Sequence, residues 1–327
     1  MTSQYQRKIS IVVGDAASGK AFDLSSFRCV FNVSQAVVQT PTTCDLKIYN
    51  LSPDTIKNLT GSSLFISAGY EGQYGQIFQG NIIQRIYGVE NSVDSYLNII
   101  ATDSIVAYNN AKLNIVLASG YTDKDIYEAI LKSFGEYGIT AGEKLDFSPN
   151  PHPRGLTLYG DAKEVLRQFA DQTGTTWNLS NGRLDMAPLS YAPDEASAIE
   201  VNSGTGLIGS PQQTADGITM RVLLNPRIKG GAIGTYIRLN NSTVVNQMKG
   251  SSSYATTDFT TIRNADGTQV TRFPSIAQDG FYRVFSASHV GDTRGNPWYT
   301  NIIAYDPKAP AYGLPRTSVW VQAQVSK

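Results

Sequence analysis

The sequence is poor in the side chains that bind metals. Its 327 residues include only two histidines, His152 and His289, and two cysteines, Cys29 and Cys44. Both histidines lie in turn-rich or strand-end segments, and there is no second cysteine pair. A structural zinc site or a His-rich catalytic metal site therefore cannot be assembled from the usual ligands. We expect no metal, no cofactor and no catalytic residues.

The sequence also lacks net charge. Lys and Arg total 27, Asp and Glu total 27, and charged residues make up 17% of the chain, against roughly 25% in an average soluble protein. Without a net positive field the chain is not drawn to nucleic acid or to anionic membranes, so avid non-specific DNA binding is not expected. The abundance of Gly, Ser, Thr and Asn indicates a β-rich protein.

Neither a secretory signal nor a long apolar run is present. Residues 1–10 contain Arg7 and Lys8 but no apolar stretch before a small-residue cleavage site. No segment is long and apolar enough to span a bilayer. We expect the protein to be made and folded in the cytoplasm, where Cys29 and Cys44 would remain free thiols. A hairpin closing near residues 34–43 could nevertheless place the two cysteines opposite each other.

One octet occurs twice. Residues 96–103 read Tyr-Leu-Asn-Ile-Ile-Ala-Thr-Asp and residues 299–306 read Tyr-Thr-Asn-Ile-Ile-Ala-Tyr-Asp, which match at six of eight positions. In each copy a glycine, Gly80 or Gly280, opens an earlier strand, so the likeness extends to a two-strand unit. Two similar β-domains are the prediction, and a chance match between strands of similar composition is the alternative.

The first hundred residues predict a small barrel. Short apolar runs separated by turn residues predict six strands, at 9–13, 28–34, 44–49, 64–70, 76–87 and 95–102. Ser52 can cap a short helical turn with Pro53 at its first position. Six strands and one brief helix are typical of a closed or nearly closed barrel.

The middle of the chain has helical patterns. Residues 123–137 place apolar side chains, Tyr137 among them, on one face, with Thr122 and Asp125 as a capping box. A second helix is expected from Asp161, with Glu164 completing its cap, to Gly174. Asn181-Gly182 then predicts a hairpin between 176–179 and 183–186. Residues 108–190 thus read as a small α/β domain inserted between β-regions.

Strand patterns resume in the last third, at 219–224, 235–239, 243–249, 281–289 and 298–305. Residues 250–275 are expected to form a long, polar, mobile loop. Several strands carry apolar residues on both faces, as in 76–87, where Ile77 and Ile83 share one side and Phe78, Ile82 and Ile86 share the other. A barrel wall in water should have one polar face, so we expect neighbouring subunits or the inserted domain to cover the other.

Residues 14–20 fit the spacing of a phosphate-binding loop, from Gly14 to Gly19 and Lys20. Position 21 is alanine, so the hydroxyl that would hold magnesium is missing, and residues 22–27 lack a helical pattern that could receive phosphate. A hairpin turn is the favoured interpretation, with nucleotide binding as the alternative.

A catalytic dyad can be imagined at His289, which precedes Asp292 and Arg294. No nucleophile elbow accompanies it, and Gly, Asp and Asn are ordinary residues of hairpin tips. A structural tip is therefore favoured. A glycosidase pair of carboxylates is neither indicated nor excluded, because such pairs meet only in the fold.

Several short sequence segments together resemble those of tail and baseplate hub proteins of Mu-like and related contractile-tailed phages, a group that includes the late control gene D-like family. The segments begin at Asp45 (Asp-Leu-Lys-Ile-Tyr-Asn-Leu-Ser), Ala68 (Ala-Gly-Tyr-Glu-Gly), Ile77 (Ile-Phe-Gln-Gly-Asn-Ile), Gly206 (Gly-Leu-Ile-Gly-Ser-Pro), Leu223 (Leu-Leu-Asn-Pro-Arg) and His289 (His-Val-Gly-Asp-Thr-Arg-Gly-Asn-Pro-Trp-Tyr-Thr). Their order covers nearly the whole chain.

The resemblance implies a β-rich α+β fold with two similar tail-tube-like β-barrels, at 1–107 and 191–327, and a small α/β domain at 108–190. It implies a homotrimer in the virion tail baseplate, assembled in the host cytoplasm. The trimer would form a pseudo-sixfold ring between tail-tube or tube-initiator proteins and a spike protein, around the channel through which phage DNA passes. The alternative is a β-rich, tail-associated cell-wall hydrolase or carbohydrate-binding component.

Overall fold

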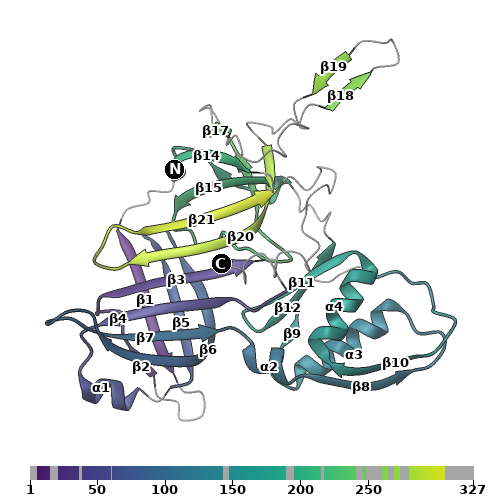
Figure 1. Cartoon of the computed structure of the whole chain (residues 1–327), viewed down its shortest axis with the longest axis horizontal. Coiled ribbons are helices and arrows are strands. Elements are labelled where there is room, and N and C mark those ends of the chain that lie inside the picture. Colours follow the sequence, from purple (N-terminus) through teal and green to yellow (C-terminus); the bar gives the residue numbers. More distant parts are fainter. Residues whose placement is uncertain are drawn as a thin grey trace.

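The chain has a β-rich fold built around one large, mostly antiparallel sheet (Figure 1). The structure is a computed structural model that describes residues 6–14, 21–36, 39–59, 61–142, 147–188, 195–214, 217–240, 246–247, 260–263, 269–272 and 280–305. Within these ranges, every helix is too short or too polar to cross a membrane.

The first set of strands fills the part of the chain predicted to be a barrel. Its strands are β1 (Arg7–Gly14), β2 (Ala21–Asp23), β3 (Cys29–Ala36), β4 (Thr43–Tyr49), β5 (Ser63–Tyr70), β6 (Gln73–Val89) and β7 (Ser95–Thr102). They lie in the order β3-β4-β7-β6-β5-β1-β2. Helix α1 (Pro53–Asn58) begins as predicted, since Ser52 Oγ accepts the Thr55 N–H at 3.1 Å.

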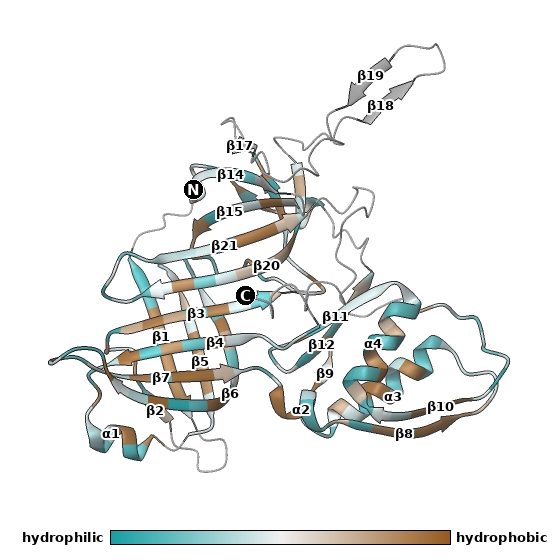
Figure 2. Ribbon diagram, in the orientation of Figure 1, coloured by the Kyte–Doolittle hydropathy of each residue, from teal (hydrophilic) through white to brown (hydrophobic). Residues whose placement is uncertain are grey.

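Alternating side chains bury one face of the first set. Along β3, for example, Cys29, Phe31 and Val33 are buried while Asn32 and Ser34 are exposed. The same alternation of apolar and polar residues is visible along the neighbouring strands in Figure 2. The core formed by these buried side chains also includes Leu224 and Trp298 from the far end of the chain.

The two cysteines are free and buried, as predicted. The expectation that they could lie opposite each other is wrong. Cys44 pairs with Val33 and Cys29 pairs with Ile48 in the ladder between β3 and β4. Four residues of strand separate the two positions, or about 13 Å at 3.3 Å per residue, which is too far for a disulfide. Burial raises the pKa of the Cys29 thiol to about 12, so it stays protonated.

The middle of the chain forms a compact α/β unit with its own core. Its elements are α2 (Ile105–Asn110), β8 (Lys112–Leu117), α3 (Asp123–Gly135), β9 (Thr140–Ala141), β10 (Leu156–Asp161), α4 (Ala162–Thr173), β11 (Thr175–Ser180) and β12 (Arg183–Pro188). β8 pairs with β10, and β12 lies between β11 and β9. Helices α3 and α4 pack against these sheets around the fully buried Trp177.

Both predicted helices exist, with two corrections. The capping box of α3 is present, since Thr122 N–H donates to Asp125 Oδ2 at 2.7 Å. Tyr137 lies beyond the end of α3 and is 40% exposed, so it does not belong to the buried face. Asp161 precedes α4 but makes no side-chain cap, and Glu164 pairs with Arg167 one turn later.

The Asn181-Gly182 hairpin is also confirmed. Both residues have positive φ, 52° and 71°, and they connect β11 to β12. This is the conformation that a two-residue turn of the type favoured by right-handed strand twist requires.

The second set of strands contains β13 (Ile199–Val201), β14 (Leu207–Thr214), β15 (Gly217–Leu223), β16 (Tyr236–Leu239), β17 (Asn246–Gln247), β20 (Gly280–Asp292) and β21 (Trp298–Tyr305), preceded by the 3-10 turn η1 (Glu195–Ser197). The loop predicted at 250–275 contains an antiparallel pair of strands, β18 (Thr260–Arg263) and β19 (Gln269–Arg272), so that prediction is wrong for these residues. Its other residues, and most of the strand predicted at 243–249, lie outside the described residues.

The two sets repeat one connectivity. In the first set the spatial order is β3-β4-β7-β6-β5-β1, and in the second it is β14-β15-β21-β20-β16-β13. When the strands of each set are numbered along the chain, the two spatial orders are the same, with β2 as an addition in the first set and β17 in the second. One difference is the last pair, because β1 runs antiparallel to β5 whereas β13 runs parallel to β16.

The repeated octet forms β7 and β21 and occupies the same place in each set. In each set the preceding long strand, β6 or β20, has a bulge opposite the same part of the octet. The pairs that flank the bulges are Ile82–Ala101 and Gln84–Ile100 in the first set, and Val284–Ala304 and Ser286–Ile303 in the second. The octet is therefore a structural repeat and not a coincidence of composition.

The predicted match between Gly80 and Gly280 is wrong by two residues. Since the bulges make Ile82 equivalent to Val284, Gly80 is equivalent to Tyr282. A Cβ at Gly80 would lie 2.8 Å from the backbone of Asp103, so this glycine is required by a close approach specific to the first set.

The two sets form one sheet because β20 pairs with both. Its first four residues pair with β16, and its segment from Ser286 to Asp292 pairs with β3. Figure 1 shows the resulting row from β14 at the top through β20 and β3 to β7, with the α/β unit to one side. Within the described part of the chain no ladder joins β1 to β3, so the first set is not closed by hydrogen bonds between its own ends.

Candidate functional site

The phosphate-loop motif connects two paired strands. Residues 15–20 lie outside the described residues, but β1 and β2 on either side form an antiparallel ladder in which Gly14 faces Ala21. A phosphate loop needs a helix after the loop, and here a strand follows it. The arrangement agrees with the predicted hairpin.

His289 and Asp292 lie on the same strand but serve different contacts. His289 is fully buried, and its Nδ1 lies 2.9 Å from Thr300 Oγ1 on the neighbouring β21. Burial, with a contribution from the charge of Lys229, lowers the pKa of His289 to about 4, so the imidazole is neutral at pH 7. A neutral imidazole that is buried and bonded to a threonine has no access to a substrate.

Asp292 organises the tip between β20 and β21. Its carboxylate accepts from Arg28 at 2.9 Å and from the Arg294 N–H at 2.9 Å. Burial disfavours the charged form, but these hydrogen bonds and the Arg28 charge outweigh it and lower the pKa of Asp292. These contacts agree with the predicted structural role of the tip, and the ion pair with Arg28 connects it to the start of β3.

A seam of contacts holds the tip against the first set. Trp298 lies edge-on to Phe31 at 5.5 Å between ring centroids, and its indole N–H donates to Gly69 O at 3.3 Å. Arg7 lies over the Trp298 ring at 5.4 Å and donates to Gly295 O at 2.6 Å. The final hairpin is thus anchored in the first core by a buried aromatic ring and a guanidinium.

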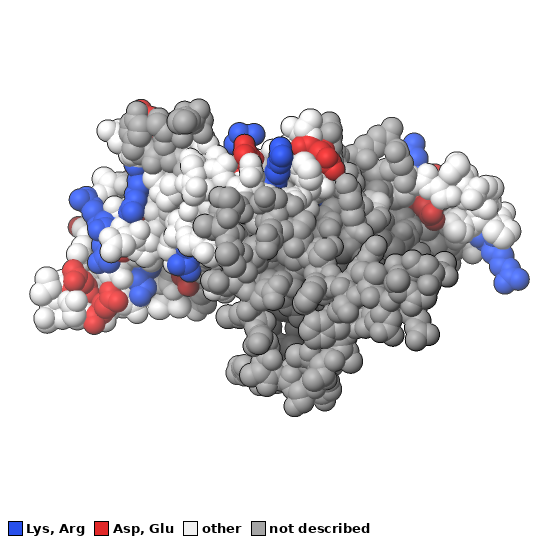
Figure 3. All heavy atoms as spheres, turned by 90° about the horizontal axis from the view of Figure 1, so that it is seen from above, with Lys and Arg blue, Asp and Glu red and all other residues white. Residues whose placement is uncertain are grey.

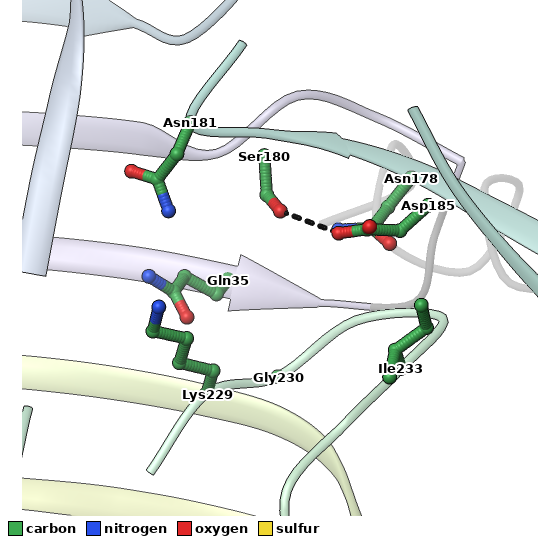
Figure 4. Close-up of a pocket in the computed structure, with 8 residues that line it drawn as sticks. All are labelled: Gln35, Asn178, Ser180, Asn181, Asp185, Lys229, Gly230 and Ile233. Carbon is green, nitrogen blue, oxygen red and sulfur yellow. Dashed lines mark hydrogen bonds between the residues drawn. The ribbon is translucent and has the colours of Figure 1, made fainter. Parts of the chain in front are cut away.

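A second junction brings together all three parts of the chain. A small cavity of about 40 Å³ lies between them, and Figure 4 shows its lining: Gln35, Asn178, Ser180, Asn181, Asp185, Lys229, Gly230 and Ile233. These residues come from β3, from the β11–β12 hairpin and from the loop between β15 and β16. Ligand sites usually measure roughly 300–1,000 Å³, so this cavity has room for water but not for a ligand of that size.

The junction is closed by hydrogen bonds to backbone groups. Asn178 Oδ1 accepts the Ala232 N–H at 2.8 Å. Gly231 has φ of 127°, and a Cβ there would lie 2.6 Å from the Asn178 amide, so only glycine lets the loop approach this closely. The fully buried Arg283 donates to Pro188 O at 3.1 Å and to Ala232 O, which binds the end of β12 to the same loop.

Asp103 links the first set to the α/β unit. It is 4% exposed, it accepts the Asn181 N–H of the hairpin, and it accepts from Ser104 Oγ at 2.7 Å. Burial raises the pKa of Asp103, while these hydrogen bonds act in the opposite direction. Asp103 is the last residue of the first octet, so the repeat marked this position, although nothing in the sequence indicated its partner.

These junctions connect the two strand sets and the α/β unit through buried side chains and hydrogen bonds. In the described part of the chain, no group of three or more His, Cys, Asp or Glu side chains is placed to hold a metal ion. The second histidine, His152, lies 2.9 Å from Asp123 Oδ1 and stacks on Tyr121 at 4.6 Å, near the start of α3. Figure 3 shows Lys and Arg near Asp and Glu across the described part of one face.

Comparison with known proteins identifies the fold. No protein-family model matches the sequence, and no curated protein matches it. Similar solved structures exist. The 43 kDa tail protein of prophage MuSo2 from Shewanella oneidensis has a TM-score of 0.56 and 10% identity, over 92% of this chain and 97% of that one. A tail protein from Neisseria meningitidis MC58 has a TM-score of 0.54 and 11% identity over the same shares.

A third similar structure is a chain of a Francisella PdpA-VgrG complex, with a TM-score of 0.50 and 8% identity. The match covers 97% of this chain and 60% of that chain. At these identities the likeness concerns the fold. The chain therefore has the fold of phage tail proteins over nearly its whole length, which confirms in fold the resemblance to tail proteins that the sequence indicated.

Proposed function

We propose that this chain is a structural hub protein of a phage tail baseplate, with no catalytic activity. Three copies form a pseudo-sixfold ring that joins the sixfold tail tube, or its initiator, to a threefold spike and surrounds the channel for genome ejection. Each copy contributes two tube-like β-barrel domains, 1–107 and 191–327, and the α/β domain 108–190 lies between them.

The observation that carries the proposal is the repeated connectivity of the two strand sets, with its repeated bulge, inside one continuous sheet. A subunit with two equivalent wall segments offers six equivalent segments in a trimer while keeping threefold symmetry elsewhere. This is a direct way to match a sixfold partner to a threefold one, since most homo-oligomers adopt closed rotational symmetry.

Two further findings support a tail role. The structures that share the fold are named as tail proteins or belong to a complex with VgrG. The chain also has equal numbers of positive and negative side chains. A channel wall without a positive surplus retains passing DNA weakly, because each cationic contact with phosphate adds salt-dependent affinity.

The cell-wall hydrolase alternative receives no support from the site. His289 is buried and bonded to Thr300, and Asp292 is committed to Arg28 and to the turn at Arg294. Neither group lines the cavity at the second junction.

Electron microscopy of intact tails, carrying this chain with an affinity label, tests the proposal. We expect three labels at the level where tube meets spike, and a ring with six similar wall segments around a central channel. Labels found along the tail fibres, or a single copy per tail, would refute the hub assignment.

A further inference from the structure

Strand β6 has an edge that no described strand covers. Its first half pairs with β5 as far as Asn81, and the Ile82 N–H then donates to Ser62 O at 2.8 Å. From Gln84 to Val89 the strand pairs with β7 on one side only. A half-paired strand of this length exposes a row of backbone donors and acceptors, which is a template for pairing with another chain.

In the second set, another strand of the same chain covers the equivalent edge. The equivalent half of β20, from Ser286 to Asp292, pairs with β7's counterpart β21 on one side and with β3 on the other. Because the bulges align Gln84 with Ser286, Tyr87 corresponds to His289 and Val89 corresponds to Gly291. The same element therefore occurs twice in this chain, once covered and once bare.

Burial differs accordingly between the two copies. Tyr87 is 54% exposed while His289 is fully buried, and Val89 is 65% exposed while Gly291 is buried. Exposed apolar residues gather along this stretch: Ile83 (55%), Ile86 (40%), Tyr87, Val89 and the nearby Val93 (84%). Such a contiguous set of apolar side chains on a bare strand edge is typical of an interaction surface.

The strand that fits the bare edge is β14. It occupies in the second set the place that β3 occupies in the first, since Gln212 faces Thr219 of β15 as Asn32 faces Asp45 of β4. β14 lies at the far end of the row of eight strands that ends at β6, so the two edges of one copy face opposite ways. Among the described strands, the two-residue β17 is the one that pairs with the outer side of β14, at Gln212 and Gln213.

We propose that the edge of β6 from Gln84 to Val89 pairs antiparallel with β14 of a second copy of this chain, with Tyr87 opposite Gln213. This register repeats the pairing of His289 with Val33 inside one copy. β6 of the first copy then takes the position that β17 holds on β14 of the second copy. The inference rests on the proposed function, because it names the joint by which the ring would form.

The joint uses two different surfaces, so it determines how the copies assemble. Each copy offers one β6 edge and one β14 edge, which are different surfaces. A head-to-tail contact of this kind closes into a ring or extends as a filament. Three copies close the ring that the proposed function requires, and the sheet then continues from copy to copy with the same neighbours as inside one copy.

The first test is the mass of the full chain in solution, with and without Tyr87→Asp. We expect the wild type to sediment as a trimer of about 107 kDa, three times 35.5 kDa. The variant should assemble only at a protein concentration at least about tenfold higher, because each joint would bury an unpaired carboxylate. Tyr159→Asp is the matched control. Tyr159 is 79% exposed on β10, away from both edges, so this variant should assemble as the wild type does.

The second test fixes the register by a disulfide. Directly opposed residues of antiparallel strands have Cα atoms about 4.5–5.5 Å apart, within the range of a disulfide. A chain carrying Tyr87→Cys and Gln213→Cys should therefore give covalent trimers under mild oxidation. The pair Tyr87→Cys and Gln212→Cys should not, because a one-residue shift places the thiols on opposite faces. The native Cys29 and Cys44 are buried and do not compete.

The outcomes separate the two proposals. A wild-type trimer that tolerates Tyr87→Asp and forms no cross-link overturns the β6–β14 joint and leaves the trimeric hub standing. A wild type that remains monomeric at high concentration and forms no cross-link overturns both. Cross-linked species that stop at two copies contradict the head-to-tail ring.

Discussion

Buried His289 should make the stability of this protein depend on pH between neutrality and pH 4. The imidazole is fully buried beside Thr300, with Ala287 and Val290 as close neighbours along β20. Burial lowers its pKa from 6.5 to about 4. In the unfolded chain the same group is free to take up a proton at its ordinary pKa.

The direction in which stability changes with pH follows from where the proton binds. Between pH 6.5 and pH 4 the unfolded chain binds a proton at His289 that the folded chain refuses, so acid favours unfolding. The stability is fully present above pH 6.5 and is lost as pH falls toward 4. A lowering from 6.5 to about 4 corresponds to about 3 kcal/mol in total, and most of it is lost by pH 4.5.

The perturbation that tests this is His289→Asn, which keeps a polar group beside Thr300 but cannot be protonated in this range. Urea unfolding at pH 8.0 and pH 4.5, at one salt and one protein concentration, gives the free energy of unfolding of each variant. The variant is expected to be less stable than the wild type at pH 8.0. Between pH 8.0 and pH 4.5, however, it should lose about 2–3 kcal/mol less than the wild type loses.

His152→Asn is the matched control, because it removes the other histidine, which lies at a partly exposed position beside Asp123. It should keep the loss seen in the wild type. If the wild type and His289→Asn lose the same free energy between the two pH values, His289 is protonated as easily in the folded chain as in the unfolded one, and the prediction is wrong.

Three further predictions concern the junctions and the chemistry. Trp298→Ala should cost about 3–5 kcal/mol in urea unfolding, because it empties the contact with Phe31 between the two strand sets. Asp103→Ala leaves the partly buried Asn181 N–H without its acceptor, so we expect a loss of about 1–3 kcal/mol and faster proteolytic cleavage near the hairpin, and unchanged cleavage would contradict this role of Asp103. Purified protein should release no fragments from peptidoglycan, and turnover that disappears in Asp292→Asn would instead establish the hydrolase alternative.

Much of the local structure was predictable because its causes are local. Alternating burial along β3 and β7, the Ser52 cap and the Asn181-Gly182 turn each depend on a few consecutive residues. The predictions that were wrong involve competition between nearby groups or distant ones. Glu164 pairs with Arg167 instead of completing a cap, and Gly80 is required by the backbone of Asp103, not by the repeat.

The site was predictable only in outline. The sequence indicated both positions: the octet ending at Asp103 is a repeat, and Asp292 lies in a predicted turn. Their partners, Asn181 and Arg28, are 78 and 264 residues away along the chain. No short-range pattern specifies a contact at that separation, because it depends on how whole strands are placed in the sheet.

By itself, the sequence determined that this chain alternates strands and turns, repeats a strand pair, and inserts a small helical unit between the repeats. The tertiary structure alone decided which strand edges are satisfied. β6 and β20 carry the same bulge opposite the same octet, yet β20 is covered by β3, while no described strand covers the second edge of β6 from Gln84 onward. Alternation of side chains tells which face of a strand is buried, but its edge hydrogen bonds go to whichever strand the fold brings beside it.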